Sequence, residues 1–243
     1  MITRSPSLTD QVKSHIRQRI VDGGFEDGRI PPETELAEEL GVRRTTVRDA
    51  LSRLENEGAI YRRQGAGTFV NEHGLRIKSR LEEIWSYEQV LADHGYEPSV
   101  QVLSESLGPT DDATAEQLGL DPSDEVLSIE KVFLENRDPV IVTINRIPTA
   151  MLGDSDYAAD EAAPLYQFVE AHCDRVLEYY LSEIIPVVLD ADTAATLGVA
   201  EGTPALCFDE IGFDQNNEPI ARATSFFRDD LLRFRMMRRR TRT

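Results

Sequence analysis

Arginine and threonine side chains gather in a short segment near the amino terminus, between Gly41 and Leu51. Arginine can donate two parallel hydrogen bonds to the edge of guanine, and threonine offers a hydroxyl and a methyl group to thymine. A single arginine is most often a solvated surface charge, whereas several on one scaffold point to contact with bases and phosphates. The residues concerned are Arg43, Arg44, Thr45, Thr46, Arg48 and, further along the chain, Arg62.

Three helices, over residues 8–20, 31–40 and 43–57, and a β-hairpin over 59–71 are predicted to carry these side chains. Apolar residues recur every three or four positions in each helix, and glycines stand where the helices end and where the hairpin turns. Helix, short turn, helix and two-stranded wing form the layout of a winged helix-turn-helix. In that layout the third helix presents its first residues to the major groove of DNA.

Four motifs run through these elements: Gly28-x-x-Pro31-Pro32-Glu33-x-Glu35-Leu36-Ala37, Gly41-Val42-Arg43-Arg44-Thr45-Thr46-Val47-Arg48-Asp49-Ala50-Leu51, Leu54-Glu55-x-Glu57-Gly58 and Arg62-Arg63-Gln64-Gly65-x-Gly67-Thr68-Phe69-Val70. Together they resemble the GntR superfamily of bacterial and archaeal repressors, and the resemblance covers the whole of residues 1–73. Two positions depart from the family pattern: Pro32 replaces a common serine cap, and Thr34 replaces an arginine that often contacts phosphate. The positions that the resemblance places at the DNA are Glu33, Thr34, Arg43, Arg44, Thr45, Thr46, Arg48, Arg62, Gln64, Gly65 and Gly67.

The rest of the chain is expected to form a linker over residues 74–85 and an α+β domain over 86–243. Short apolar runs separated by turn residues predict paired strands, and two segments, 164–173 and 192–197, are typical of helices. Adjacent strands with segregated helices indicate an α+β sheet domain. The strand candidates are Val100–Leu103, Val126–Leu134, Val140–Ile144, Ile184–Leu189 and Ala205–Phe213.

Turn and core motifs in this second region form a recognisable series: Gly95-Tyr96-x-Pro98, Leu118-Gly119-Leu120, Asn136-Arg137-Asp138-Pro139, Arg146-Ile147-Pro148, Leu197-Gly198-Val199-x-x-Gly202-Thr203-Pro204 and Phe227-Arg228-Asp229-Asp230-x-x-Arg233-Phe234. They resemble the UTRA effector-binding domain of HutC-like GntR regulators. The resemblance implies the chorismate lyase fold with a mixed sheet, a small-molecule effector and a homodimer.

The effector itself is not indicated by the resemblance, because the usual ligand-binding positions differ. Two arginines of relatives align with Lys131 and Phe133, a glutamate aligns with Thr143, and a Glu-Tyr pair aligns with Ala221-Arg222. Lys131 and Arg222 favour an anionic group on the effector, although each could equally pair with a carboxylate of the domain. The candidate effector-binding residues are Ser86, Tyr87, Lys131, Phe133, Thr143, Asn145, Glu183, Arg222 and Ser225.

The charge of the chain is −18 at pH 7, and almost all of it lies outside the predicted DNA-binding domain. Residues 1–73 contain 11 Lys+Arg and 12 Asp+Glu, while the remainder contains 15 and 32. Only three of the basic residues are lysines, a composition that indicates a salt-rich cytoplasm, as in a halophilic archaeon, although an ordinary acidic regulatory domain also explains it. High salt weakens the contribution of counterion release to DNA binding, so direct base and wing contacts are expected to matter more.

No apolar run approaches the roughly 20 residues that a membrane span requires, and the amino terminus lacks the apolar core of a signal peptide. A cytoplasmic protein without cofactor, metal or catalytic residue is therefore expected. The histidines show no metal-ligand spacing, and Cys173 and Cys207 are interpreted as reduced thiols. The six arginines between Arg233 and Arg242 could touch DNA, or could form a solvated terminus.

These patterns favour a dimeric repressor that binds a palindromic operator in double-stranded DNA and responds to a metabolite. Two other classes are weighed against it. An enzyme related to chorismate lyase is disfavoured, because the second region shows no nucleophile–base pair or paired carboxylates at readable spacing. An architectural DNA-binding protein without an effector is disfavoured by the 170 or so residues that follow the predicted wing.

Overall fold

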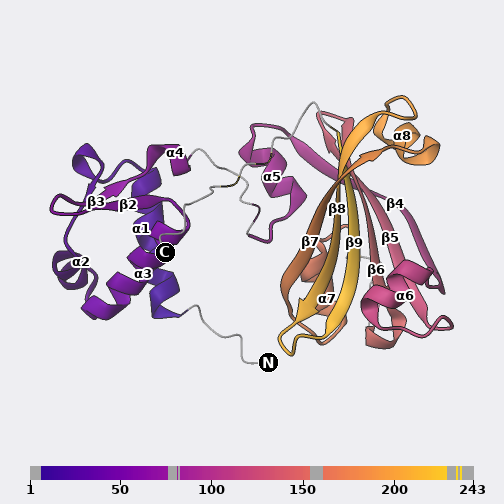
Figure 1. Cartoon of the computed structure of the whole chain (residues 1–243), viewed down its shortest axis with the longest axis horizontal. Coiled ribbons are helices and arrows are strands. Elements are labelled where there is room, and N and C mark those ends of the chain that lie inside the picture. Colours follow the sequence, from indigo (N-terminus) through magenta and orange to yellow (C-terminus); the bar gives the residue numbers. More distant parts are fainter. Residues whose placement is uncertain are drawn as a thin grey trace. The chain divides into compact units, whose positions relative to one another are not determined.

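The computed structural model describes residues 7–75, 81, 83–153, 161–228, 234 and 236. They form two compact units, one of residues 7–75 together with 236 and the other of the described residues from 81 to 234 (Figure 1). The first, the head, contains helices α1 (Leu8–Val21), α2 (Glu33–Leu40), α3 (Arg44–Asn56) and α4 (Glu72–Leu75) and strands β1 (Arg29–Ile30), β2 (Ile60–Arg63) and β3 (Gly67–Val70). The second, the sheet unit, contains strands β4 (Pro98–Pro109), β5 (Glu125–Glu135), β6 (Asp138–Pro148), β7 (Leu177–Val188), β8 (Pro204–Asp214) and β9 (Pro219–Phe227) and helices α5 (Tyr87–Asp93), α6 (Asp112–Leu118), α7 (Leu165–His172) and α8 (Ala191–Leu197).

The head is a three-helix unit built on one apolar core. The buried stripe of α1, which includes Ile16 and Ile20, packs with Leu51 and Leu54 of α3. Gly41 ends α2 in the left-handed region at φ 64°, a conformation that glycine adopts without steric cost. The turn that follows places α3 directly after α2, so the helix-turn-helix expected from the sequence is present.

The wing contains a strand that the sequence pattern did not predict. β3 pairs with β2, as expected for the hairpin, and also with β1, giving a three-stranded antiparallel sheet in the order β1-β3-β2. A strand of two residues is too short to show the period-two alternation by which strands are predicted. Pairing with β1 fixes one edge of the wing to the segment that precedes α2.

The head extends beyond the expected domain end at residue 73. α4 continues to Leu75, which packs against the core of the head. Gly74 lies against the backbone of Gly58, so close that an added Cβ would stand 2.0 Å from the Gly58 carbonyl oxygen. At the other end of the predicted linker, Leu81 and Trp85 pack against a core cluster of the sheet unit. Residues at both ends of the predicted linker therefore belong to the two units.

A Gly74→Ala variant is expected to destabilise the head by about 1–3 kcal/mol, because backbone must move to admit the methyl group. Faster hydrogen exchange of the α1 and α3 amides measures this loss. Gly108→Ala is the matched control, since a Cβ at Gly108 meets nothing within 4 Å. Equal protection of the two variants would contradict the close approach at Gly74.

The sheet unit is an α+β fold, as predicted, around one six-stranded sheet of order β4-β5-β6-β9-β8-β7. All five strand pairs are antiparallel, so the sheet is not the mixed sheet that the resemblance implied. α5 and α7 cover one face, where they pack with apolar clusters around Phe133 and Ile129 respectively. α8 packs with Val132 on the opposite face, and α6 contacts Arg222 there (Figure 1). We call these the α5/α7 face and the α6/α8 face.

Tight turns set the register of the two hairpins in this sheet. Asn136 and Arg137 both have positive φ and join β5 to β6, and Asn217, also at positive φ, lies between β8 and β9. β7 begins seven residues before the predicted strand 184–189. The prediction missed its first half because Glu178, Ser182 and Glu183 interrupt the apolar pattern of this mostly exposed strand.

Candidate DNA-binding surface and effector pocket

The exposed face of α3 carries the basic and hydroxyl side chains that the sequence assigns to DNA. Val47, Leu51 and Leu54 are buried against the core of the head. The helical period therefore directs Arg44, Thr45 and Arg48 to solvent, and Arg43, at the N-cap, is also exposed. Thr46 is half-buried. The first turn of α3 thus presents a guanidinium- and hydroxyl-rich surface, as a recognition helix requires.

Glu33, the first residue of α2, lies between two of these arginines. Its carboxylate accepts a hydrogen bond from Arg44 Nε at 3.0 Å, and Arg62 Nη2 of the wing lies 3.9 Å from it. Arg62 also pairs with Glu55 of α3 at 3.2 Å. These contacts orient the two guanidinium groups. Glu33 therefore positions Arg44 and Arg62.

The tip of the wing is exposed and depends on glycine. Gln64, Gly65 and Gly67 are all exposed, with positive φ at both glycines, 74° and 118°. Thr34 is exposed on the first turn of α2. All positions assigned to DNA therefore belong to three segments of one unit: the starts of α2 and α3 and the wing.

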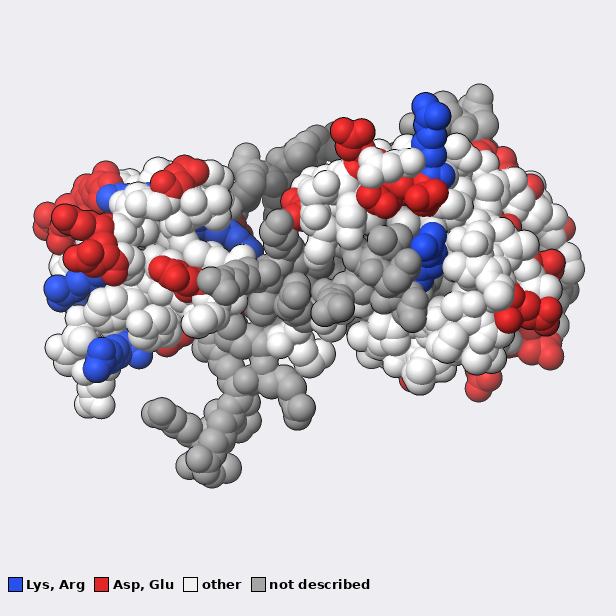
Figure 2. Space-filling view, turned by 90° about the horizontal axis from the view of Figure 1, so that it is seen from above, with Lys and Arg blue, Asp and Glu red and all other residues white. Residues whose placement is uncertain are grey.

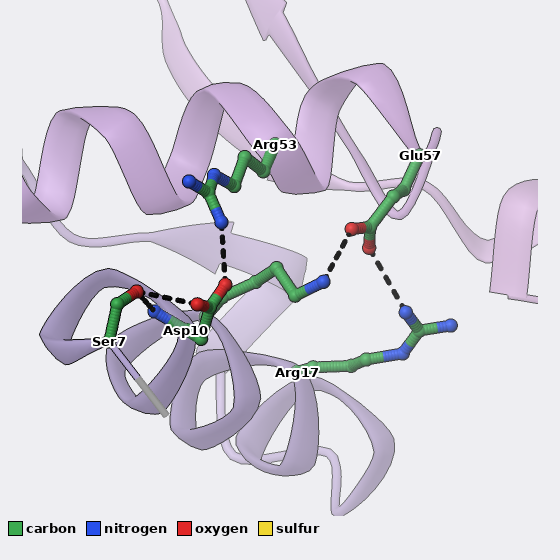
Figure 3. Close-up of polar contacts among 6 residues, drawn as sticks. Ser7, Asp10, Arg17, Arg53 and Glu57 are labelled. Atoms are coloured by element: carbon green, nitrogen blue, oxygen red, sulfur yellow. Dashed lines mark hydrogen bonds and ion pairs between the residues drawn. The ribbon is translucent and has the colours of Figure 1, made fainter. Parts of the chain in front are cut away.

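Other basic residues of the head are held in ion pairs between α1 and α3 (Figure 3). Lys13 and Arg17 donate to the two carboxylate oxygens of Glu57 at 2.8 and 3.0 Å. Arg53 donates to Asp10 at 2.5 Å. These contacts fix α3 against α1, so the cations are used for positioning the recognition helix.

A Glu57→Gln variant is expected to lower the stability of the head by about 1 kcal/mol, because one half-buried carboxylate pairs two cations. Hydrogen exchange of the α1 amides in low salt measures the loss. The difference from the unsubstituted protein should shrink as salt screens the pairs. Glu38→Gln, at an exposed position of α2, is the control, and an equal effect of both variants would show that the Glu57 pairs contribute nothing.

The α5/α7 face of the sheet carries a buried line of polar side chains. Strand register places Lys131 of β5 opposite Thr143 of β6, and Thr143 opposite Ser225 of β9. Asn145 and Glu210 lie two residues further along on the same face, each paired with Ala223 of β9. We call these five residues, Lys131, Thr143, Asn145, Ser225 and Glu210, the polar row. It lies between the apolar cluster under α5 and the apolar cluster under α7.

Lys131 is buried at 2% exposure, an unusual position for a lysine. Its Nζ donates to the carbonyl oxygen of Ala163 at 2.6 Å. Burial lowers the pKa of Lys131 to about 8, against an opposing effect of the nearby Glu88 and Glu161 carboxylates. Lys131 is therefore a buried amino group whose charged form is disfavoured by burial and favoured by two nearby carboxylates.

The hydroxyl groups of the polar row are unequally satisfied. Tyr87, the first residue of α5, donates from its hydroxyl to Ser225 Oγ at 2.9 Å, and its ring packs edge-on against Phe133 and Phe227. Burial raises the pKa of the Tyr87 hydroxyl. Thr143 is 2% exposed, and its Oγ1 has no hydrogen-bond partner among the described residues. Such a group costs folding free energy unless something binds it.

Arg222 and Glu183 lie on the α6/α8 face, away from the polar row. Arg222 is opposite Ile211 in register, one face away from Ser225, and pairs with Asp209 through two hydrogen bonds of 3.0 Å. It also donates to Thr114 of α6. Of the two alternatives for Arg222, the structure therefore shows the one in which it pairs with a carboxylate of its own domain. Glu183 is opposite Asp209 and exposed.

Two residues of the α5/α7 face, Glu210 of the polar row and Tyr180, are not among the candidate effector-binding residues predicted from the sequence. Glu210 accepts a hydrogen bond from Ser182 of β7, and burial raises the pKa of Glu210. Tyr180 lies on the same face of β7, and burial raises its pKa as well. Counting back from the Asn216-Asn217 turn would pair Glu210 with Arg222 on the α6/α8 face, but a bulge between Gly212 and Phe213 shifts the register, so Glu210 pairs with Ala223 and lies on the face of Ser225.

An open cleft lies between α5 and the start of α7, with a volume of roughly 360 Å³. Ser86, whose hydroxyl caps α5 by accepting from the Gln89 backbone, is at its wall. Glu88, whose carboxylate raises the pKa of Lys131, lines the same cleft. Lys131 does not line the cleft, but its hydrogen-bond acceptor, Ala163, precedes the lining residue Pro164. The other lining residues are Gln89, Ala92, Pro98 and Gln167.

The visible surface is mainly acidic, unlike the arginine-rich start of α3. Figure 2 shows acidic side chains spread over the visible surface of both units, with few basic ones between them. The arginine-rich segment 233–242 lies largely outside the described residues. None of the described helices is long and apolar enough to cross a membrane.

The three-helix head, with an arginine-bearing helix exposed beside a wing, defines a winged helix-turn-helix protein. Comparison with known families gives the same result: the bacterial regulatory proteins of the gntR family match residues 8–70, and the UTRA domain matches residues 93–233. The chain belongs to the GntR family, in the group that carries a UTRA domain. It is a transcriptional regulator and not an enzyme, since that is what the family and its similar members are.

Similar proteins cover nearly the whole chain. The HTH-type transcriptional repressor NagR of Bacillus subtilis is 27% identical over 225 residues, which are 92% of this chain and 91% of the relative. The mannosyl-D-glycerate transport/metabolism system repressor MngR of Escherichia coli is 28% identical over 82% of each chain. Two solved structures share the fold. The possible transcriptional regulator YydK of B. subtilis has a TM-score of 0.73 at 17% identity, with 95% of this chain and 99% of that chain covered. PhnF of Mycobacterium smegmatis has a TM-score of 0.61 at 25% identity, with 95% and 100% covered.

Proposed function

We propose that this chain is a cytoplasmic homodimeric repressor that binds a two-fold symmetric operator and releases or tightens its hold when a small metabolite occupies the polar row. The observation that carries the proposal is the exposed first turn of α3, with Arg44 and Arg48 beside the wing residue Arg62. Base edges in the major groove are the partners that such a surface fits. The relatives named for mannosyl-D-glycerate and fructoselysine support target genes that handle a small metabolite.

The edge strand β7 supports the dimer. Leu181, Ile184, Ile185 and Val188 are 59, 44, 37 and 71% exposed, and β7 forms the end of the sheet. An exposed apolar edge strand is a template for pairing with another chain. A second copy that covers β7 would bury these side chains, and two-fold symmetry would then set two recognition helices against two half-sites.

The bond between Tyr87 and Ser225 supports a response to the metabolite. Tyr87 begins α5, two residues after Trp85, whose ring stacks on Phe234. A ligand hydroxyl that bonds Ser225 competes with Tyr87 and so acts on the segment by which the chain enters the sheet unit. The largest change in operator affinity that the ligand can cause is set by the difference between its own affinities for the two conformational states.

Selection of duplexes from a random DNA pool, followed by footprinting of the winning sequence, tests the proposal. We expect an inverted repeat with half-sites about one helical turn apart, protected on both sides of a two-fold axis. Binding should persist at raised KCl more than is usual for DNA-binding proteins, because the head has no excess of cations. Protection of one site without an inverted repeat would contradict the dimeric repressor.

A further inference from the structure

The polar row contains a hydroxyl group that has no hydrogen-bond partner among the described residues. Thr143 Oγ1 lies in the middle of the row, between Lys131 on β5 and Ser225 on β9. Valine would fill the same volume without the cost of an unsatisfied hydroxyl. A threonine at this position is therefore explained by a ligand atom that donates to it or accepts from it.

The charge around the polar row limits what that ligand can be. Among the strands of the sheet unit, all of them described, only three residues are cationic, and Lys131 alone lies on the α5/α7 face. The other two, Arg146 and Arg222, lie on the α6/α8 face in contact with Asp111 and Asp209. One lysine compensates one negative charge.

Two further features disfavour a dianion. Lys131 already donates one hydrogen bond to Ala163, and the carboxylates of Glu88 and Glu161 act on it. Glu210 adds a carboxylate to the same row. A phosphate monoester carries a charge of roughly −1.5 to −2 at pH 7 and is usually bound by arginine forks. Neither the charge nor the donors for such a group are present among the described residues of this face.

We propose that the polar row binds a small hydroxylated molecule with a single carboxylate group, such as a sugar acid, in preference to a phosphate ester. Lys131 donates to the carboxylate. Thr143, Ser225 and Asn145 exchange hydrogen bonds with the hydroxyl groups, and Glu210 accepts from the hydroxyl at the far end. The apolar clusters on both sides of the row receive the C–H surfaces. The inference rests on the proposed function, since it names the chemistry of the same effector.

Calorimetry and thermal melting of the full chain at pH 7, without DNA, test the inference. The probes are aldonic and uronic acids of the common hexoses, each compared with its parent hexose and the hexose 6-phosphate. We expect at least one acid to raise the melting temperature and to bind at least tenfold more tightly than its two matched compounds. The single tryptophan, Trp85, packs against Tyr87 at 6.0 Å between ring centroids and reports binding by its fluorescence.

Two substitutions locate the site. Thr143→Val and Lys131→Met should each weaken the acid at least tenfold, while the ligand-free Thr143→Val protein melts at the same temperature or higher. Thr224→Val, on β9 but on the α6/α8 face opposite Ile144, should bind as the unsubstituted protein does. Melting without ligand separates a lost site from a lost fold.

Three results would overturn the inference: tighter binding of a 6-phosphate, no binding of any acid, or equal binding by the Thr143→Val and unsubstituted proteins. If a phosphate ester alters operator binding through the polar row, the ligand class is wrong and the proposed repressor stands. If no operator is selected at all, the proposed function fails independently of the ligand.

Discussion

An Arg48→Ala variant is expected to bind the selected operator roughly 5- to 150-fold more weakly, with most of its preference over random DNA lost. Such a factor corresponds to the about 1–3 kcal/mol that a bidentate contact with a base contributes. The Arg48 side chain is 57% exposed on the first turns of α3, and its contact with Asp49 is long, at 3.9 Å. Removal of the guanidinium should therefore leave the head folded. Titration of operator and random duplexes at one fixed salt concentration measures both quantities.

A matched arginine on the same helix provides the control. Arg53 points toward α1, where it pairs with Asp10 (Figure 3), so Arg53→Ala should keep the ratio of operator to random binding. Thr45→Ala should reduce discrimination as Arg48→Ala does, since Thr45 is exposed at the start of α3. Retention of operator preference by both Arg48→Ala and Thr45→Ala would refute the assignment of α3 as the recognition helix.

The second large effect is expected from charge placed on β7. A Leu181→Glu/Ile185→Glu variant should be monomeric and should bind the operator at least 100-fold more weakly, because each head then binds its half-site alone. Linked binding modules gain factors of about 10² to 10⁴ over separate ones. Both side chains lie on the α6/α8 face of the strand, opposite Ile211 and Cys207. Light scattering gives the mass, and operator titration gives the affinity.

The opposite edge of the sheet offers a control of similar exposure. Leu103, 44% exposed, lies on β4, at the other end of the strand order. Leu103→Glu should leave both the mass and the operator affinity unchanged. A dimer that survives the double substitution on β7 but dissociates with Leu103→Glu would place the interface at β4, and a monomeric unsubstituted protein would exclude a dimer altogether.

Much of the head could be predicted from sequence because its structure is local. The spacing of Val47, Leu51 and Leu54 determines which face of α3 is buried, and so it also determines that Arg44 and Arg48 face solvent. Local patterns did not show which carboxylates pair with the other basic residues of the head. Lys13 and Glu57 are 44 residues apart, and only the packing of α1 on α3 brings them together.

The arginine-rich start of α3 is therefore a property that the sequence by itself determines, because helical periodicity fixes the direction of each side chain from its neighbours. The polar row was decided by the tertiary structure. Lys131 and Arg222 are equally plausible ligand groups in the sequence, yet they lie on opposite faces of the sheet. Side chains alternate between faces with a period of two, so a shift of one residue moves each side chain to the other face. Register between β6 and β9, which are adjacent in the sheet but separated in sequence by β7 and β8, is set only when the whole sheet assembles.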